Sequence, residues 1–482
     1  MSMFTGFSNA FKIPELRKKI LITLGLVAVC RLISLIPTPG INWVALSSAL
    51  ESARASHALG GMYGMFDAFT GGSFAVCAIG TLSIWPYISA QIVIQLLSSV
   101  IPALEKLKKE GESGRQQLSQ ITRYLAIVIC VAQAFSISLA LMNGAELAQM
   151  LHVTDAKTIA DLKNVVVNPG VGFQMMTVIC MTSATLFIMW ISDQITTFGV
   201  GNGGSLIIMI NITSRLPNAV KQAWLRYFGA GTPDGAGGTA ANGSITELVL
   251  LLLFGFVVIM GTVVLTQGVR KVAIHATRRS MGGGNTYGMQ QTYMPLRVNY
   301  TGVMPIIFAQ PLLQIPAMLL AQIPTGKNVC LDWLQRFGME LAKTDSLTHI
   351  ALYAAFILFF AFFWVATQFN AVEISENLKK DGSYVPGIRP GLATAEYLDA
   401  VMTRITLIGG GGLVLVAIIP HVLTRFLGLQ YQPDIVSFFG GTSLLIIVGV
   451  ALDTLRIMES HLLVRKYEGF LRHGTLRGRG GL

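Results

Sequence analysis

The stretch LVLLLLFGFVVIMGTVVLTQGV, residues Leu248–Val269, decides the fold class. It holds 22 consecutive residues without an Asp, Glu, Lys or Arg. A helix rises about 1.5 Å per residue, so about 20 apolar residues cross the roughly 30 Å hydrocarbon core of a bilayer. We therefore predict that this stretch forms a transmembrane helix.

Comparable charge-free runs recur along the 482 residues. Charged residues make up 12% of the chain and the mean hydropathy is +0.61, whereas soluble domains carry about 25% charged residues. The other nine runs are approximately 32–50, 68–104, 124–145, 164–192, 194–214, 298–326, 346–372, 405–424 and 435–452. They are continuously apolar, without the alternation of a membrane β-barrel. The sequence thus predicts an all-α polytopic membrane protein with ten transmembrane helices, the first starting near Ile20.

The basic residues are distributed unevenly between the two sides of such a bundle. With the N-terminus inside, the inner segments hold 24 of the 35 Lys and Arg residues and the outer segments hold 10. Since basic loops stay in the cytoplasm, both termini are predicted to be cytoplasmic. The excess, part of a net charge of +11, has two interpretations. It orients the chain and contacts anionic lipid, or it forms a docking surface for an acidic protein or for RNA phosphate.

Motifs for an enzyme or a metal site are not convincing. GVGNGG (Gly199–Gly204) fits GxGxxG, but no strand precedes it, so it predicts no nucleotide site. The five cysteines form no CxxC pair, which argues against a disulfide framework or a zinc site. We expect no catalytic residues, no metal and no cofactor.

The predicted spans contain few polar residues that could take part in chemistry. No Asp or Glu lies well inside a span, which counts against proton or cation coupling. Several spans are broken by Pro or Gly, and broken helices can line a cavity. Such a bundle suits a pore that passes diverse substrates. The alternatives are a small-molecule secondary transporter with discontinuous helices and a structural scaffold for a cytoplasmic complex.

Two segments and one residue need their own interpretation. Gly229–Ser244 is small and polar, which predicts a flexible outer linker. Gly60–Val76 is too apolar for an outer loop, so it either lies on the membrane or folds back into the protein. Arg31, the one charge inside a span, either bonds to neighbouring groups or faces a water-filled cavity.

Six longer stretches are far more specific than the short motifs. They are WPYISAQIVIQLL (Trp85–Leu97), KKEGESGRQQLSQITRY (Lys108–Tyr124), ISDQITTFGVGNGGS (Ile191–Ser205), NYTGVMPIIFA (Asn299–Ala309), FNAVEISENLKKDGSYVPGIRPG (Phe369–Gly391) and FFGGTSLLII (Phe438–Ile447). Together they resemble, nearly end to end, the bacterial SecY family of channel subunits of the protein-export translocon.

The resemblance implies an hourglass pore between two pseudo-symmetric halves of five helices. The implied domains are an N-terminal half (1–228), a flexible outer linker (229–246) and a C-terminal half (247–482) with cytoplasmic docking loops 267–298 and 370–403. A plug closes such a pore, and a lateral gate opens it to lipid. The implied location is the bacterial cytoplasmic (inner) membrane.

The resemblance also assigns residues to the pore. The pore ring is Ile84, Ile88, Ile208, Ile307 and Ile446, with Gly204 at the sixth position, where the family usually has an apolar side chain. The plug, near residues 63–74, includes Tyr63, Met65, Phe66, Asp67, Phe69, Thr70, Gly71, Gly72 and Phe74. The lateral gate includes Tyr87, Ile92, Gln95, Thr301 and Pro305. Branched apolar rings dewet when empty and resist ions.

The resemblance gives the basic loops a role as well. The implied partners are the small subunits SecE and SecG, the ATPase SecA, a translating ribosome and its RNA, signal peptides, nascent polypeptides and membrane lipid. The implied docking residues are Lys106, Lys108, Lys109, Arg270, Lys271, Arg278, Arg279, Lys379, Lys380 and Arg389. Arg389 is expected to be the main contact, because GIRPG holds its guanidinium on a stiff turn and guanidinium binds carboxylate or phosphate in a bidentate manner.

Overall fold

The computed structural model describes residues 13–43, 45–46, 70–74, 76–143, 165–228, 245–276, 292–321, 329–342, 346–426 and 441–473. The chain divides into two compact units. One contains Met1–Pro217 with Val450–Leu482, and the other contains Asn218–Gly449. Helix α20 (Gly441–His473) begins in the second unit and continues into the first. Of the predicted linker, 229–246, only the last two residues are described, so the division into two five-helix halves stays a prediction.

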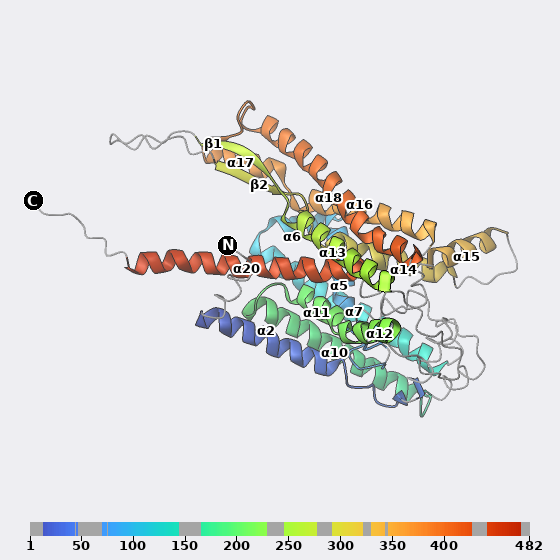
Figure 1. Cartoon of the computed structure of the whole chain (residues 1–482). Coiled ribbons are helices and arrows are strands. Elements are labelled where there is room, and N and C mark those ends of the chain that lie inside the picture. The colour runs from blue at the N-terminus through green and yellow to red at the C-terminus, as the bar shows by residue number, and fades with distance from the viewer. Residues whose placement is uncertain are drawn as a thin grey trace, which may run out of the picture. The chain divides into compact units, whose positions relative to one another are not determined.

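The first unit is built from packed helices (Figure 1). They are α2 (Pro14–Ile33), α5 (Trp85–Val100), α6 (Pro102–Lys109), α7 (Glu112–Met142), α10 (Val171–Phe198), α11 (Gly203–Thr213) and the start of α12 (Leu216–Phe228). Helix α7 contacts both α5 and α10, and α10 also contacts α2 and α11. Small residues such as Ala90 and Ala126 are buried where α5, α7 and α10 meet, which lets the helix backbones approach closely.

Proline and asparagine set where these helices begin. Helices α2, α5 and α6 each have Pro in the first turn, where the missing N–H costs no hydrogen bond. Helix α11 is capped by Asn202, whose side chain accepts a hydrogen bond from the Ser205 N–H. The predicted span 194–214 is therefore broken, because α10 ends at Phe198 before α11 begins.

The first helix lies earlier in the chain than its charge-free run. Helix α2 ends at Ile33, whereas the run extends over 32–50. Pro37 and Pro39 cannot continue a helix, and Pro37 instead forms a β-bridge with Ala78. The first part of the run therefore covers the end of α2 and the turn and β-bridge that follow it, and residues 44 and 47–50 lie outside the described residues.

The second unit contains long helices and a small sheet. Its helices are most of α12, α13 (Ile245–Gln267), α14 (Met304–Ala321), α15 (Val329–Ala342), α16 (Leu347–Gln368), α17 (Ala371–Lys380), α18 (Leu392–Phe426) and the start of α20. Its strands are β1 (Val269–Ala276), β2 (Thr292–Arg297) and β3 (Ser383–Tyr384). The antiparallel sheet has the order β2-β1-β3. The sequence did not predict this sheet.

Five described helical segments are long and apolar enough to cross a membrane. They are Glu112–Met142, Val171–Phe198, Ile245–Gln267, Leu347–Lys380 and Leu392–Ile418. The pair Trp85–Ser98 and Pro102–Lys108, bent by 104°, makes up to six if it counts as one span. The observed architecture is that of a mostly helical membrane protein, and the finer count of ten spans stays a prediction.

Candidate functional site

The first unit brings three of the predicted ring positions together. Ile84 and Ile88 lie one turn apart at the start of α5, and Ile208 lies in α11. All three side chains are buried. A Cβ placed on Gly204 would lie 3.6 Å from Cδ1 of Ile84. Gly204 therefore lies beside a ring residue, one helical turn before Ile208.

The chain reaches this arrangement through a strained turn. Ser83, directly before Ile84, has a φ of 48°, in the left-handed region that is unfavourable for residues other than glycine. Its hydroxyl accepts a hydrogen bond of 2.9 Å from Nδ2 of Asn211 on α11. This bond joins the turn before α5 to α11.

The second unit buries the other two ring positions. Ile307, in the first turn of α14, is 2% exposed, and Ile446, near the start of α20, is 0% exposed. A Cβ on Gly449 would overlap Cγ1 of Val303, so α20 packs tightly where α14 begins. Each isoleucine lies about one turn from this contact. The ring as a whole takes residues from both units and stays a prediction.

Most of the predicted plug lies outside the described residues, including Tyr63, Met65, Phe66, Asp67 and Phe69. Thr70, Gly71, Gly72 and Phe74 are described. Thr70 is buried, and its carbonyl accepts a hydrogen bond of 2.9 Å from the hydroxyl of Ser73. The end of the plug segment is thus a tight turn packed inside the first unit.

Arg31 reaches this turn. It donates to the carbonyl of Gly71 and to Oδ1 of Asn211, each at 3.3 Å. Of the two interpretations of Arg31, the structure therefore shows hydrogen bonds to neighbouring groups. Sequence reasoning missed Asn211, its partner Ser83, and Ser214, whose hydroxyl lies 3.4 Å from the Gly71 carbonyl oxygen. The one available signal was that Asn211 is a polar residue within an apolar run.

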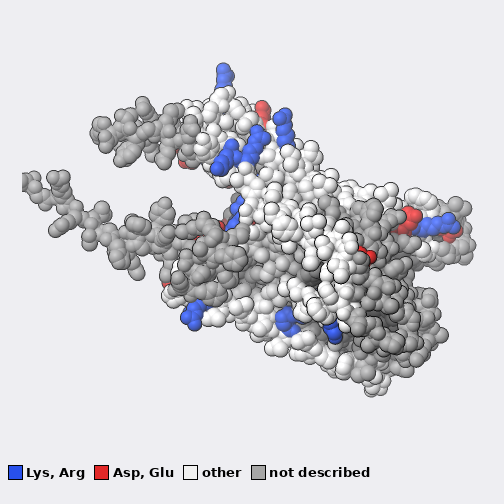
Figure 2. Space-filling model, viewed as in Figure 1, with Lys and Arg blue, Asp and Glu red and all other residues white. Residues whose placement is uncertain are grey.

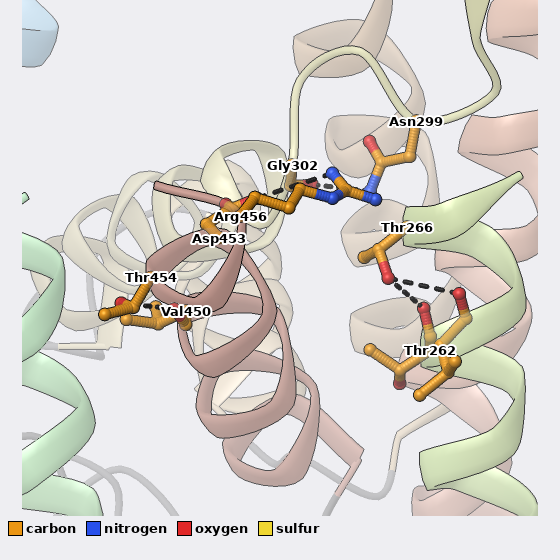
Figure 3. A network of polar contacts seen from close by, with 9 residues as sticks. Thr262, Thr266, Asn299, Gly302, Val450, Asp453, Thr454 and Arg456 are labelled. Atoms are coloured by element: carbon orange, nitrogen blue, oxygen red, sulfur yellow. Dashed lines mark hydrogen bonds and ion pairs between the residues drawn. The ribbon is translucent and has the colours of Figure 1, made fainter. Parts of the chain in front are cut away.

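The predicted lateral gate has members in both units, each described within its own unit. On α5, Ile92 is buried, whereas Tyr87 and Gln95 are half-buried. Before α14, the Thr301 hydroxyl donates to Oδ1 of Asn299 at 3.1 Å. Nδ2 of Asn299 donates to the Gly302 carbonyl at 2.9 Å, and Figure 3 shows both of these residues. Pro305, the last predicted member, is buried at the start of α14. These contacts fix the turn that begins α14, and the gate itself stays a prediction.

The two predicted docking loops are joined in one sheet. β1 and β2 come from loop 267–298, and β3 comes from loop 370–403. His275 pairs with Tyr384 in the strand register, and their rings lie 5.9 Å apart. Beneath the sheet, Val272, Leu296 and Val385 are buried against α18. We call this body, comprising β1, β2, β3, α17 and the start of α18, the platform.

The platform carries exposed basic side chains. Figure 2 shows Lys and Arg gathered on the surface at the β1, β2 and α17 region labelled in Figure 1. The exposed predicted docking residues here are Arg270, Lys271, Lys379, Lys380 and Arg389. Elsewhere, Lys106 and Lys108 are exposed on α6. Arg278, Arg279 and the side chain of Lys109 lie outside the described part of the chain.

Arg389 sits on a turn that the local sequence fixes. Gly387 and Gly391 flank it with φ values of 81° and 109°, which glycine adopts readily. The Thr394 hydroxyl donates to the Arg389 carbonyl at 2.9 Å. These contacts hold the backbone that carries the exposed Arg389 side chain, and its role in docking stays a prediction.

The comparisons with known proteins agree with this architecture. A family model described as SecY matches residues 78–455. The chain belongs to the SecY family. It is 38% identical over 471 residues to the protein translocase subunit SecY of Streptomyces scabiei, covering 98% of this chain and 100% of that one. It is 35% identical over 480 residues to the SecY subunit of Thermotoga maritima, covering 99% and 100%.

Solved SecY channel structures share the fold. One, in which the plug domain stabilises the closed state and maintains a membrane seal, has a TM-score of 0.54 at 16% identity over 97% of this chain and 98% of that one. Another, of a protein-conducting channel, has a TM-score of 0.54 at 14% identity over the same shares. The chain is thus a SecY-type channel subunit of the Sec protein translocase, a family of transport proteins that are not enzymes. The resemblance stated from the six sequence stretches is confirmed.

Proposed function

We propose that this chain passes unfolded secretory polypeptides through the ring of Ile84, Ile88, Ile208, Ile307 and Ile446 and releases transmembrane segments sideways into lipid. One observation carries the proposal: each of these five isoleucines is a fully apolar side chain that is buried within its own unit. Such side chains exclude water and ions when the pore is empty. They also bind no passing side chain strongly, which suits varied substrates.

The energy comes from partners bound at the platform. SecA or a translating ribosome docks on its exposed basic residues, which face carboxylates or ribosomal RNA phosphates. SecE and SecG complete the complex in the bacterial inner membrane, with both termini in the cytoplasm. A related channel has been solved in a canine ribosome-channel complex at a TM-score of 0.50 and 14% identity, which supports the ribosome as a partner.

A site-specific crosslink tests the ring. A photo-crosslinker is placed at Ile307, and a secretory chain is stalled in transit through the reconstituted translocase. The matched control carries the same crosslinker at Leu253, a 60% exposed residue of α13. We expect capture of the chain at Ile307, loss of capture when its signal sequence is deleted, and no capture at Leu253. Export that proceeds with no capture at Ile307 would refute the ring.

A further inference from the structure

One guanidinium joins three segments of the first unit. Arg31, on α2, donates from Nη2 to the Gly71 carbonyl and from Nη1 to Oδ1 of Asn211. Asn211 is held in turn, because its Nδ2 donates to Oγ of Ser83 at 2.9 Å. Arg31 thus ties the turn at the end of the plug segment to both α2 and α11.

The turn fits closely against this side chain. The φ of Gly71 is 69°, a conformation that favours glycine. A Cβ at this position would overlap Nη1 of Arg31 and would lie 2.9 Å from Oγ of Ser214 and 3.0 Å from the Asn211 carbonyl oxygen. Only hydrogen fits between the turn and its neighbours, so a movement of the turn disturbs the Arg31 contact directly.

Arg31 is the principal side-chain donor to Gly71. The hydroxyl of Ser214 also lies 3.4 Å from the Gly71 carbonyl oxygen, but it lies 2.7 Å from the Asn211 carbonyl oxygen. A hydroxyl has one proton to donate, and the shorter contact takes it. Both bonds that Arg31 donates go to neutral oxygens, so they hold the turn without the cost of separating an ion pair.

We propose that Arg31 is a positioning residue that latches the C-terminal end of the plug against α11 in the closed channel. The proposal rests on the proposed function in one respect, that the segment ending at Phe74 is the plug. When the plug leaves, the bond from Arg31 to Gly71 breaks while the bond from Arg31 to Asn211 stays available. The latch therefore stabilises the closed state alone.

The first test measures ion leak through the resting channel. The chain is reconstituted with SecE and SecG in vesicles, and the decay of an imposed potassium potential is followed without substrate. Removing one charge-assisted hydrogen bond shifts the closed-to-open ratio by about tenfold, so Arg31→Gln is expected to raise the leak about tenfold. Arg31→Lys is expected to give an ion leak between those of the wild type and Arg31→Gln, because an ammonium lacks the planar fork that reaches both acceptors.

Two further variants separate the latch from general damage. Lys18→Gln removes an exposed charge from the same helix and is expected to leave the leak unchanged. Asn211→Ala keeps the Arg31 charge but removes its second acceptor, and is expected to raise the leak less than Arg31→Gln does. Should Arg31→Gln fail to assemble, Arg31→Lys and Asn211→Ala still decide the question, and a wild-type leak in both would overturn the latch.

A second readout reports on the plug itself. Phe74→Cys is introduced into a chain whose Cys180 and Cys330 are serine, and the rate of labelling by a membrane-impermeant maleimide is measured. Arg31→Gln is expected to speed labelling, a change that a loss of fold stability far from the turn would not produce.

Deletion of residues 63–69 distinguishes the two ways of being wrong. In one outcome, the deletion raises the ion leak, whereas Arg31→Gln leaves both the leak and the labelling rate at the wild-type level. That result would overturn the latch but not the plug assignment. If neither the deletion nor Arg31→Gln raises the ion leak, the plug assignment of the proposed function is overturned.

Discussion

Replacing Gly204 with Ile is expected to tighten the seal of the resting channel. Gly204 lies in the first turn of α11 at the sixth ring position. A Cβ there would meet Oδ1 of Asn202 at 3.4 Å, Cδ1 of Ile84 at 3.6 Å and Oγ of Ser192 at 3.7 Å. These are ordinary van der Waals distances, so the backbone accepts a side chain. The new side chain starts in contact with Ile84.

The expected size follows from the added apolar surface. Isoleucine adds four carbons, and burial contributes about 0.8 kcal/mol per carbon, or about 3 kcal/mol if all were buried. Gly204 is only partly buried in this chain, so we take about half of that energy, roughly 1.5 kcal/mol. If this energy acts on the closed state alone, the ion leak falls by about tenfold.

The assay is the decay of a potassium potential across vesicles that hold the resting channel, with thermal unfolding measured in parallel. Gly203→Ala is the matched contrast, because a Cβ on Gly203 would overlap the backbone carbonyl of Ser192. We expect Gly203→Ala to lower the unfolding temperature, whereas Gly204→Ile keeps or raises it. A raised unfolding temperature with an unchanged leak would refute the reasoning, because Gly204 would then lie outside the seal.

Arg389→Glu should slow motor-driven export about tenfold or more, since it reverses a charge-assisted contact. Arg404→Glu, the same change at an exposed position of α18, should slow export much less, and equal effects would show that only net charge matters. Val385→Ala should cost the platform about 2 kcal/mol through lost burial and a small cavity, seen as faster hydrogen exchange of β3; unchanged exchange would contradict the packing. Gly409→Ala would push a methyl group onto the carbonyl that follows β2 and should lower the unfolding temperature by several degrees. Arg123→Ala breaks a 2.7 Å ion pair between α7 and α10 that is partly exposed, and should change the free energy of unfolding by at most about 1 kcal/mol.

The apolar spans could be predicted from the sequence because hydrophobicity is a property of each residue and its near neighbours. Residues 248–269, 346–372 and 405–424 all overlap described helices that are long and apolar enough to cross a membrane. The ends were less predictable. The run 32–50 begins only where α2 ends, because Arg31 interrupts the apolar part of α2. A charge-free run also does not show where Pro37 and Pro39 prevent a helix.

The small sheet could not be read from the sequence. The last residues of β1 pair with β3, more than 100 positions later in the chain. No local pattern in Ser383–Tyr384 predicts a strand of two residues. The docking residues were assigned through the family resemblance, and only the structure shows that two loops form one folded body.

The contacts of Arg31 illustrate a third limit. The sequence showed one charge in an apolar span and left two interpretations open. Hydrogen bonding to Gly71 and Asn211 depends on residues 40 and 180 positions away, and such distant partners leave no periodic signal. A family resemblance can assign residues to a predicted ring or plug, but it does not say which atoms those residues contact.

The same argument explains why the glycines of α11 differ in importance. The family resemblance marks Gly204 as a departure from the usual apolar residue, but the sequence alone does not show what either Gly203 or Gly204 contacts. In the structure, a Cβ on Gly203 meets the rigid backbone of α10, whereas a Cβ on Gly204 meets only the ends of side chains. Gly203 is therefore required for the packing of α11 on α10, and Gly204 leaves space beside Ile84. A departure from the family pattern at Gly204 can change the seal without changing the fold.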